Sequence, residues 1–372
     1  MHDPCRPRIR KPATLGQTNT VDPDVRRPAD LVRGQLEQET HSWGGGRLRR
    51  FRNAKVIAAV GLALIGGSSC AARVAGRNPY AQPARMIRLD DGRAMNFICN
   101  GRGSPTVLLE SGFGAGAAAW GTVQPVLAAK TRVCSYDRAG YGFSDPGPMP
   151  RDGEAIARDL DQALRKAGER GPFGMVGHSA GGLYARLFAA RRPDEIAGLV
   201  LVDTSVPFQD QRISGVFGRN AGGLNGLRQR PATCLRAVKK KLEEALDAAG
   251  CLPHDSAQAR AIASRPGVWE TQLSELDTLF TGTSAQVART IPNLKETPAI
   301  VLTASPTGTA AGRSDPGAIL WQALHREVAS QFLRGDLRLV KSSHLMMNDR
   351  PEVVAGAALE LVDAYRKKPA QL

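Results

Sequence analysis

Short apolar runs alternate with longer amphipathic stretches through much of the chain. The short runs are typical of buried β-strands, at Thr106–Glu110, Thr131–Tyr136, Phe173–Val176 and Gly198–Val202. The amphipathic stretches predict helices, at Trp120–Ala129, Glu154–Ala167 and 182–191. Near-continuous apolar strands that alternate with helices are typical of a parallel sheet covered on both faces. The pattern therefore predicts an α/β fold, with a mostly parallel, doubly wound sheet.

Two regions depart from this rhythm. Residues 85–89 and 94–99 flank Asp90-Asp91-Gly92, which predicts an antiparallel hairpin. Residues 206–294 are helix-prone and poor in strand signals. One helix is predicted there, with Leu235, Val238, Leu242 and either Ala245 or Leu246 on one face and a stop at Gly250.

The alternation resumes with strands at Pro298–Thr303 and Leu337–Lys341 and helices at Gly317–Phe332 and Pro351–Tyr365. We therefore predict a core of residues 84–205 and 295–372, interrupted by a helical cap at 206–294. Such an insertion lies where strands end and ligands bind.

The first 50 residues are rich in Arg, Pro, Gly and Thr and show no apolar periodicity. Such a segment buries too little apolar surface to offset the entropy of ordering, so residues 1–50 are predicted to be a disordered basic tail. Residues 1–55 hold 12 Lys and Arg against 6 Asp and Glu, so part of the net charge of +15 lies there. The rest of the chain has no basic block interleaved with aromatic residues, which argues against nucleic acid as a partner.

Residues 51–72 have the layout of an export signal. Basic residues within 47–55 precede the apolar run Val56–Ile65, and small residues follow as far as Ala72. Cys70 gives a loose match to a lipoprotein cleavage site. We expect an exported protein, extracellular or in the cell envelope. The alternatives are membrane association through a lipid or helical anchor in residues 51–72, and a segment that serves neither purpose.

The six cysteines include no C-x-x-C pair, so no metal site is expected from them. Cys99 and Cys134 lie in apolar strand candidates and are predicted to be packing residues. Cys234 and Cys251 flank a helix-like segment and could form a disulfide in an oxidising compartment.

Ser179 is the candidate nucleophile. It lies in Gly177-His178-Ser179-Ala180-Gly181, a G-x-S-x-G pattern between a predicted strand and a predicted helix. A serine at such a sharp turn has a strained backbone and an exposed hydroxyl. A serine hydroxyl needs a base, and the base needs a carboxylate that orients it.

His344 is the candidate base, because it follows the last predicted strand and comes after the serine in the chain. The other histidines are less suitable. His2 and His41 lie in the tail, His178 is expected to pack in the turn, His254 lies in the insertion and His325 lies within a helix.

Two carboxylates compete for the role of the acid. Asp203 directly follows the strand Gly198–Val202, whereas Asp315 lies in the long loop after residues 299–303. A stiff strand positions a carboxylate better than a loop does, so Asp203 is preferred and Asp315 is kept as the alternative. Asp315 would otherwise serve as a helix N-terminal residue before Pro316.

An oxyanion hole needs backbone N–H donors that point at the developing charge. The Ala180 N–H, next to the nucleophile, is one expected donor. The turn Ser111-Gly112-Phe113-Gly114 follows a strand and is expected to supply the second, from Phe113. This turn has neither of the glycine-rich phosphate-binding motifs.

Taken together, these segments resemble the α/β-hydrolase superfamily, and the resemblance covers roughly residues 84–372. The run Asp137–Ser144, Asp-Arg-x-Gly-x-Gly-x-Ser, is similar to that of the capped esterase, peroxidase-like and peptidase-like branches. The matching segments are Val107–Gly114, Tyr136–Asp145, Gly177–Gly182, Leu199–Asp203 and Ser343-His344. The chain departs from many relatives at Glu110-Ser111-Gly112, where a His-Gly pair is common.

The resemblance implies a Ser–His–Asp triad beneath a cap and, with serine at 179, argues against epoxide hydrolase and haloalkane dehalogenase chemistry. We therefore predict a serine hydrolase that cleaves an ester or related acyl bond of a small apolar substrate, without a cofactor or metal. Amide, lactone or carbon–carbon cleavage is the alternative within this class. A non-catalytic ligand-binding protein on the same scaffold is the alternative from another class.

Overall fold

The computed structural model describes residues 80, 82–219, 221, 223–241, 243–252, 257–308 and 315–367. The predicted tail at 1–50 and the predicted signal or anchor at 51–72 lie outside the described residues. Among the residues that are described, no helix has the length and apolar character needed to cross a bilayer.

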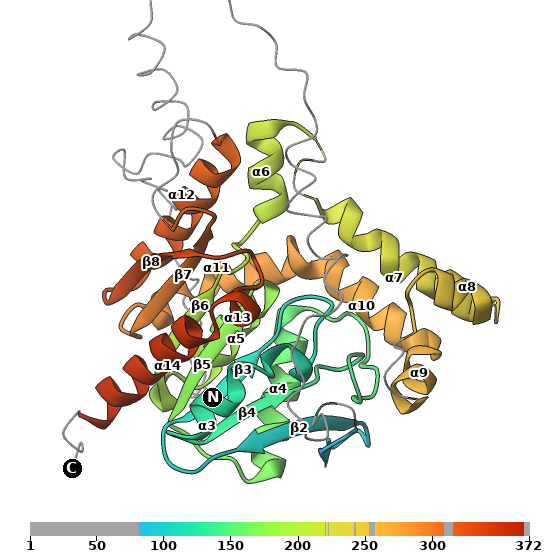
Figure 1. The fold of residues 1–372 in the computed structure, drawn as a ribbon, viewed down its shortest axis with the longest axis horizontal. Helices are drawn as coiled ribbons and strands as arrows, with labels where there is room; N and C mark the ends of the chain where they lie inside the picture. The colour runs from blue at the N-terminus through green and yellow to red at the C-terminus, as the bar shows by residue number, and fades with distance from the viewer. Residues whose placement is uncertain are drawn as a thin grey trace, which may run out of the picture. The chain divides into compact units, whose positions relative to one another are not determined.

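One eight-stranded sheet forms the centre of the fold, in the order β1-β2-β4-β3-β5-β6-β7-β8 (Figure 1). β1 and β2 are antiparallel to their neighbours and the remaining pairs are parallel, which confirms both the hairpin and the mostly parallel sheet. The strands are β1 (Arg85–Arg88), β2 (Ala94–Asn100), β3 (Thr106–Glu110), β4 (Val133–Tyr136), β5 (Phe173–His178), β6 (Ile196–Val202), β7 (Ala299–Ser305) and β8 (Gly335–Lys341).

Helices cover both faces of the sheet because its central strands are apolar on both sides. α3 (Gln124–Ala128) and α14 (Pro351–Arg366) pack on one face, where alternate residues of β3, β5, β6 and β7 join their apolar side chains. α4 (Gly153–Ala167), α5 (Ala180–Arg191) and α12 (Pro316–Ser330) lie on the opposite face. The short elements η1 (Ala117–Trp120), η2 (Pro193–Glu195) and α13 (Met346–Asp349) complete this core.

Local signals explain where these helices begin and end. Asp152 caps α4 by accepting a hydrogen bond from the Ala155 N–H, and Gly168 ends the helix with a left-handed φ of 75°. The stretch predicted as one helix at Trp120–Ala129 is instead η1 followed by α3, with Pro125 at the start of α3.

Among the described residues between β6 and β7 there are six helices: α6 (Gln209–Phe217), α7 (Leu224–Lys239), α8 (Glu243–Ala248), α9 (Ala257–Ala263), α10 (Pro266–Leu279) and α11 (Gly282–Leu294). Their status as a separate cap domain at 206–294 stays a prediction. The single helix predicted up to Gly250 is wrong, because α7 ends at Lys239 and Lys241 has a left-handed φ of 54°. The Cys234–Cys251 disulfide joins α7 to the segment that follows α8, so the pairing left open by the sequence is present.

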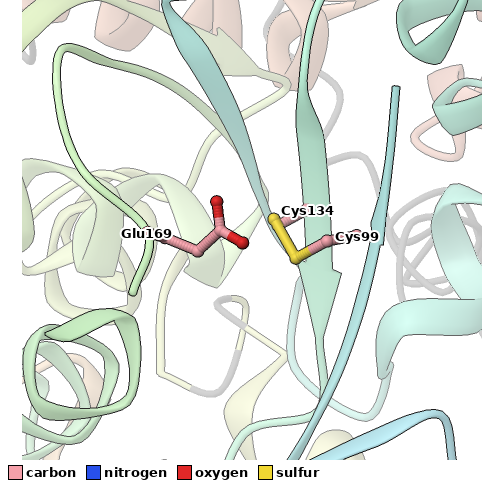
Figure 2. A group of neighbouring side chains, drawn as sticks. All are labelled: Cys99, Cys134 and Glu169. Atoms are coloured by element: carbon pink, nitrogen blue, oxygen red, sulfur yellow. A yellow bond between two sulfur atoms is a disulfide. The ribbon is translucent and has the colours of Figure 1, made fainter. Parts of the chain in front are cut away.

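The prediction that Cys99 and Cys134 are packing residues is wrong. They form a disulfide, because antiparallel pairing of β2 with β4 places the two residues directly opposite each other. Figure 2 shows the Glu169 carboxylate beside the two sulfur atoms, a grouping with the side-chain types of a metal site. The sulfur atoms are bonded to each other, and Glu169 binds the Arg132 guanidinium, so these groups are already engaged.

Candidate functional site

The carboxyl ends of the parallel strands bring the predicted site residues to one edge of the sheet. Ser179 directly follows β5, and Asp203 directly follows β6, the neighbouring strand. His344 follows β8, and the turn with Phe113 follows β3 on the other side of β5. Segments that are far apart in the sequence therefore meet around Ser179.

Ser179 occupies a strained turn. Its φ is 51° and its ψ is −125°, and α5 begins at the next residue. A Cβ atom at Gly181 would lie 2.4 Å from the Glu110 carbonyl oxygen, so only glycine allows α5 to approach β3 this closely. The strand, the sharp turn and the helix are those expected for a nucleophile elbow.

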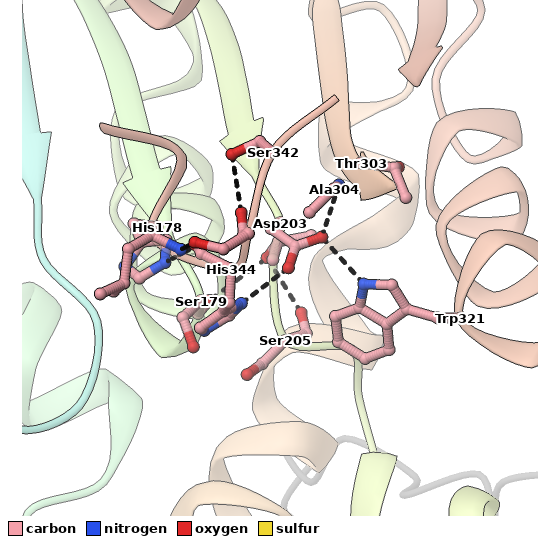
Figure 3. A network of polar contacts seen from close by, with 12 residues as sticks. His178, Ser179, Asp203, Ser205, Thr303, Ala304, Trp321, Ser342 and His344 are labelled. Carbon is pink, nitrogen blue, oxygen red and sulfur yellow. Dashed lines mark hydrogen bonds and ion pairs between the residues drawn. The ribbon is translucent and has the colours of Figure 1, made fainter. Parts of the chain in front are cut away.

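Asp203 binds His344. Its Oδ2 lies 2.6 Å from the His344 Nδ1 (Figure 3). Its Oδ1 accepts two further hydrogen bonds, from the Ala304 N–H at 2.9 Å and the Trp321 indole N–H at 2.8 Å. Burial alone would raise the pKa of Asp203, but the His344 hydrogen bond and the other donors lower that pKa below its usual value. The carboxylate is therefore charged and fixed in direction.

This contact sets the protonation of the His344 ring. Because a carboxylate only accepts hydrogen bonds, Nδ1 of His344 carries the proton, and Nε2 of the neutral ring is left to accept one. This is the tautomer that a general base for a serine needs.

His178, the residue before Ser179, holds the loop of His344 close to Ser179. The His178 Nε2 donates to the His344 carbonyl oxygen at 2.9 Å, and the ring centroids of the two histidines are 4.7 Å apart. Figure 3 draws the Ser179 side chain beside the His344 ring. Within the described residues the Ser179 hydroxyl makes no hydrogen bond to His344, as is common in catalytic sites without a bound substrate.

His178 has the packing role that the sequence predicted for it. The residue is buried, and burial, followed by the nearby His344, lowers the pKa of His178 to about 3. The ring is therefore neutral, and its Nε2–H holds the loop that carries His344.

The alternative acid, Asp315, does not bind His344. Its carboxylate accepts a hydrogen bond from the Ala318 N–H at 3.1 Å and caps α12. This is the structural role that the sequence offered for Asp315.

The sequence analysis missed two residues of α12 that contact the site, Trp321 and His325. The His325 Nε2 donates to the Thr204 carbonyl at 2.8 Å, so its Nδ1 accepts from the Thr303 hydroxyl at 2.8 Å. Burial lowers the pKa of His325, which keeps the ring neutral beside Asp203. The i, i+4 spacing places Trp321 and His325 on one face of the helix predicted after Asp315, but the sequence does not show which neighbour that face contacts.

The turn after β3 lies against the nucleophile. A Cβ atom at Gly112 would lie 2.9 Å from the His178 Nδ1 and 3.1 Å from the Ser179 Cβ, so this position also requires glycine. Within the described part of the chain, neither the Phe113 N–H nor the Ala180 N–H has a hydrogen-bond acceptor. Two donors are thus available on the two sides of Ser179.

Comparison with known families agrees with this geometry. The sequence profile of the alpha/beta hydrolase fold matches residues 105–237. A Klebsiella pneumoniae protein, RutD, provisionally named a carbamate hydrolase, is 37% identical over 103 residues, which are 27% of this chain and 38% of that protein. An uncharacterized Bacillus subtilis protein, YbdG, is 31% identical over 130 residues, 34% of this chain and 40% of that protein. The matches therefore span less than half the length of these relatives.

Solved structures show the same fold over most of the described chain. An esterase from Exiguobacterium antarcticum has a TM-score of 0.53 at 15% identity, covering 75% of this chain and 98% of its own. The epoxide hydrolase CorEH has a TM-score of 0.52 at 18% identity, covering 75% of this chain and 98% of its own. The resemblance inferred from the sequence motifs is confirmed at the level of the superfamily and its fold.

Proposed function

Since this chain is a member of the alpha/beta hydrolase superfamily, we propose that it is a serine hydrolase that cleaves an ester or related acyl bond of a small apolar molecule. Ser179 is the nucleophile, His344 the base and Asp203 the acid. The observation that carries the proposal is the 2.6 Å contact between the His344 Nδ1 and the Asp203 carboxylate. It leaves the His344 Nε2 as a proton acceptor at the turn that holds Ser179.

The reaction begins with attack of the Ser179 Oγ on the carbonyl carbon of the substrate, while His344 Nε2 takes the hydroxyl proton. The carbonyl oxygen gains negative charge in the tetrahedral intermediate. The N–H groups of Phe113 and Ala180 have no acceptor within the described residues and are proposed to hold this oxyanion. Asp203 stabilises the imidazolium that forms.

The intermediate collapses when His344 gives its proton to the leaving group, and the acyl group remains on Ser179. A water molecule then attacks this acyl-enzyme. His344 takes a proton from the water and returns it to the Ser179 oxygen, which releases the acid. The chemistry is the same for an ester, a carbamate or an amide. The ester is preferred because it has the better leaving group.

The test compares the wild type with Ser179→Ala on p-nitrophenyl esters of increasing chain length, with matched amides and lactones. We expect Ser179→Ala to lower kcat by about 10⁴-fold or more. Ser205→Ala is the control, since Ser205 lies nearby in the loop after β6 and its side chain has no part in the proposed chemistry (Figure 3). Equal activity in wild type and Ser179→Ala would overturn the proposal.

Labelling with a fluorophosphonate separates the enzyme from the alternative, a ligand-binding protein on the same scaffold. The proposal expects rapid labelling of Ser179 in the wild type and none in Ser179→Ala. A folded protein that binds small apolar molecules without labelling would support the ligand-binding alternative.

We also propose that the protein acts outside the reducing cytosol. The two disulfides, Cys99–Cys134 and Cys234–Cys251, favour an oxidising compartment, and the predicted export signal at 51–72 agrees with it. Sequencing the N-terminus of the mature protein tests the proposal. A mature chain that begins downstream of the apolar run supports cleavage, and a retained or lipid-modified start supports an anchor.

A further inference from the structure

A second buried group of charges lies under the turn that carries Phe113. Its members, here called the arginine cluster, are Glu110 at the end of β3, Arg138 after β4 and Glu275 of α10. Each of the three is at most 2% exposed. Arg138 Nη1 binds Glu110 at 2.8 Å, and Arg138 Nη2 binds Glu275 at 3.0 Å. One guanidinium thus links the central sheet to a helix of the predicted cap.

The same guanidinium binds the backbone of the turn. Its Nη1 donates to the Ser111 carbonyl at 2.5 Å, and its Nη2 donates to the Gly112 carbonyl at 3.0 Å. The peptide bond between Gly112 and Phe113 is trans, so its C=O and its N–H point in opposite directions. Fixing the Gly112 carbonyl toward Arg138 therefore turns the Phe113 N–H away from Arg138.

We propose that Arg138 is a positioning residue that sets the direction of the Phe113 N–H. Glu275 binds Arg138 from helix α10, so the position of this helix also affects that direction. The inference rests on the proposed function, in which the Phe113 N–H is an oxyanion donor. Arg138 acts through the peptide and does not touch the substrate. Removal of an oxyanion donor lowers kcat by about 10²–10³-fold. A change in the direction of the Phe113 N–H can therefore also lower kcat substantially.

Arginine suits this position for two reasons. Its planar fork can serve two carboxylates and two carbonyls at once, whereas a lysine ammonium is a point charge with three donors. Its flat faces also lie near aromatic rings, 4.6 Å from the Tyr141 centroid and 5.1 Å from the Tyr184 centroid. Arg138→Lys therefore keeps the charge and loses the geometry.

The tyrosines around the cluster fix its carboxylates. The Tyr184 hydroxyl, from α5, donates to Glu275 at 3.0 Å, and the Tyr136 hydroxyl, from β4, donates to Glu110. Glu275 therefore receives bonds from Arg138 and from the helix that begins at the nucleophile. Glu275→Gln keeps the shape and one acceptor oxygen while removing the charge, which makes it a milder test than a change at Arg138.

The first experiment measures kcat and KM for the best ester with wild type, Arg138→Lys and Glu275→Gln. We expect kcat to fall by about 10–100-fold in Arg138→Lys and by less in Glu275→Gln, with KM changed by less than about threefold. Arg186→Lys is the matched control, because Arg186 is also a buried arginine but contacts Gln331, directly after α12, instead of the turn. A purely structural role would lower thermal stability in both arginine variants and leave kcat of the folded fraction unchanged.

The second experiment uses amide hydrogen exchange of the substrate-free protein, so it does not depend on activity. We expect exchange to rise together in residues 111–116 and in α10 around Glu275 in Arg138→Lys, and to stay at the wild-type rate there in Arg186→Lys. If the wild type hydrolyses none of the substrates, the proposed function fails. The exchange data still test whether Arg138 couples the Phe113 turn to α10. Unchanged exchange in both segments, or a kcat loss equal to that of Arg186→Lys, would overturn the inference.

Discussion

Two buried groups of charge lie on opposite sides of Ser179, and they differ in how their charges are balanced. On one side, the Asp203 carboxylate accepts hydrogen bonds from the His344 imidazole, the Trp321 indole and a backbone N–H. On the other, the permanent cation Arg138 is shared by Glu110 and Glu275. On the Asp203 side, His344 gains a positive charge only when it takes up a proton during the proposed reaction. On the other side, Arg138 carries its positive charge before the reaction begins.

The comparison teaches that burial serves two purposes in this site. Beside His344, a buried carboxylate prepares the place where positive charge develops during the reaction. Under the Phe113 turn, a buried ion pair holds a backbone in one direction. The first role should be measured in kcat alone, and the second in kcat together with stability and loop order. The following predictions separate them.

The largest expected effect is from Asp203→Asn. The amide can no longer fix the His344 tautomer, so we expect kcat to fall by about 10⁴-fold while the fold is retained. The control is Asp315→Asn, whose amide oxygen can still cap α12, so both stability and kcat should stay almost unchanged. The measurements are steady-state kinetics and urea unfolding. A greater loss of kcat in Asp315→Asn would reverse the choice of acid.

Removal of the arginine charge should be the most costly change to stability. Arg138→Met leaves Glu110 and Glu275 buried without their cation, so we expect the free energy of unfolding to drop by about 3–5 kcal/mol. Arg186→Met is the contrasting control. Burial lowers the pKa of Arg186 to about 10, and among the described residues its side-chain partner is the neutral Gln331 amide instead of a carboxylate. Urea unfolding should show a clearly smaller loss for Arg186→Met, and equal losses would contradict the comparison.

The pH dependence of stability should identify Glu110. Burial, opposed by Arg138 and by the Tyr136 hydrogen bond, raises the pKa of Glu110 to about 7. The unfolded chain has the lower pKa, so the folded state binds more protons between these two values and stability falls as pH rises through about 7. Asp203 has the opposite sign, because its lowered pKa contributes stability that is lost only in acid.

Thermal unfolding from pH 5 to pH 8 measures this effect, with Glu110→Gln as the comparison variant. We expect the wild type to lose stability by a few kcal/mol over this range relative to Glu110→Gln. Parallel stability curves for the two proteins would show that Glu110 stays charged throughout.

The smallest expected effect is from Trp321→Phe. The change removes one of the donors to the Asp203 Oδ1 and leaves the Ala304 N–H, so we expect kcat to fall by about 3–10-fold. Trp269→Phe is the matched control, since the Trp269 indole donates to the Ala263 carbonyl within the helices between β6 and β7. A loss of kcat as large as in Asp203→Asn would mean that Trp321 does more than orient the carboxylate.

The sequence was most informative where a residue directly follows a strand. Ser179 and Asp203 come at the ends of β5 and β6, and parallel strands carry such residues to one edge. For this reason the fold and the contact between Asp203 and His344 could be anticipated. The Trp321 contact could not be, because it depends on how α12 packs against β7.

The other failures involve contacts between segments far apart in the sequence and one local break in a helix. Cys99 and Cys134 pair because β2 lies beside β4 instead of β3, and the apolar pattern of each strand carries no information about its neighbour. The contact of Arg138 with Glu275 joins residues 137 positions apart, across an insertion whose packing no periodicity specifies. The break at Lys240 was missed because the apolar periodicity continues through it.

The positive φ of Ser179 has a consequence for how variants should be screened. Only glycine adopts that backbone conformation without steric strain, so Ser179→Gly should relieve strain on the order of 1 kcal/mol. The inactive Ser179→Gly variant should therefore have a higher melting temperature than the active wild type. A search for improved forms that ranks clones by melting temperature alone would reward loss of the nucleophile.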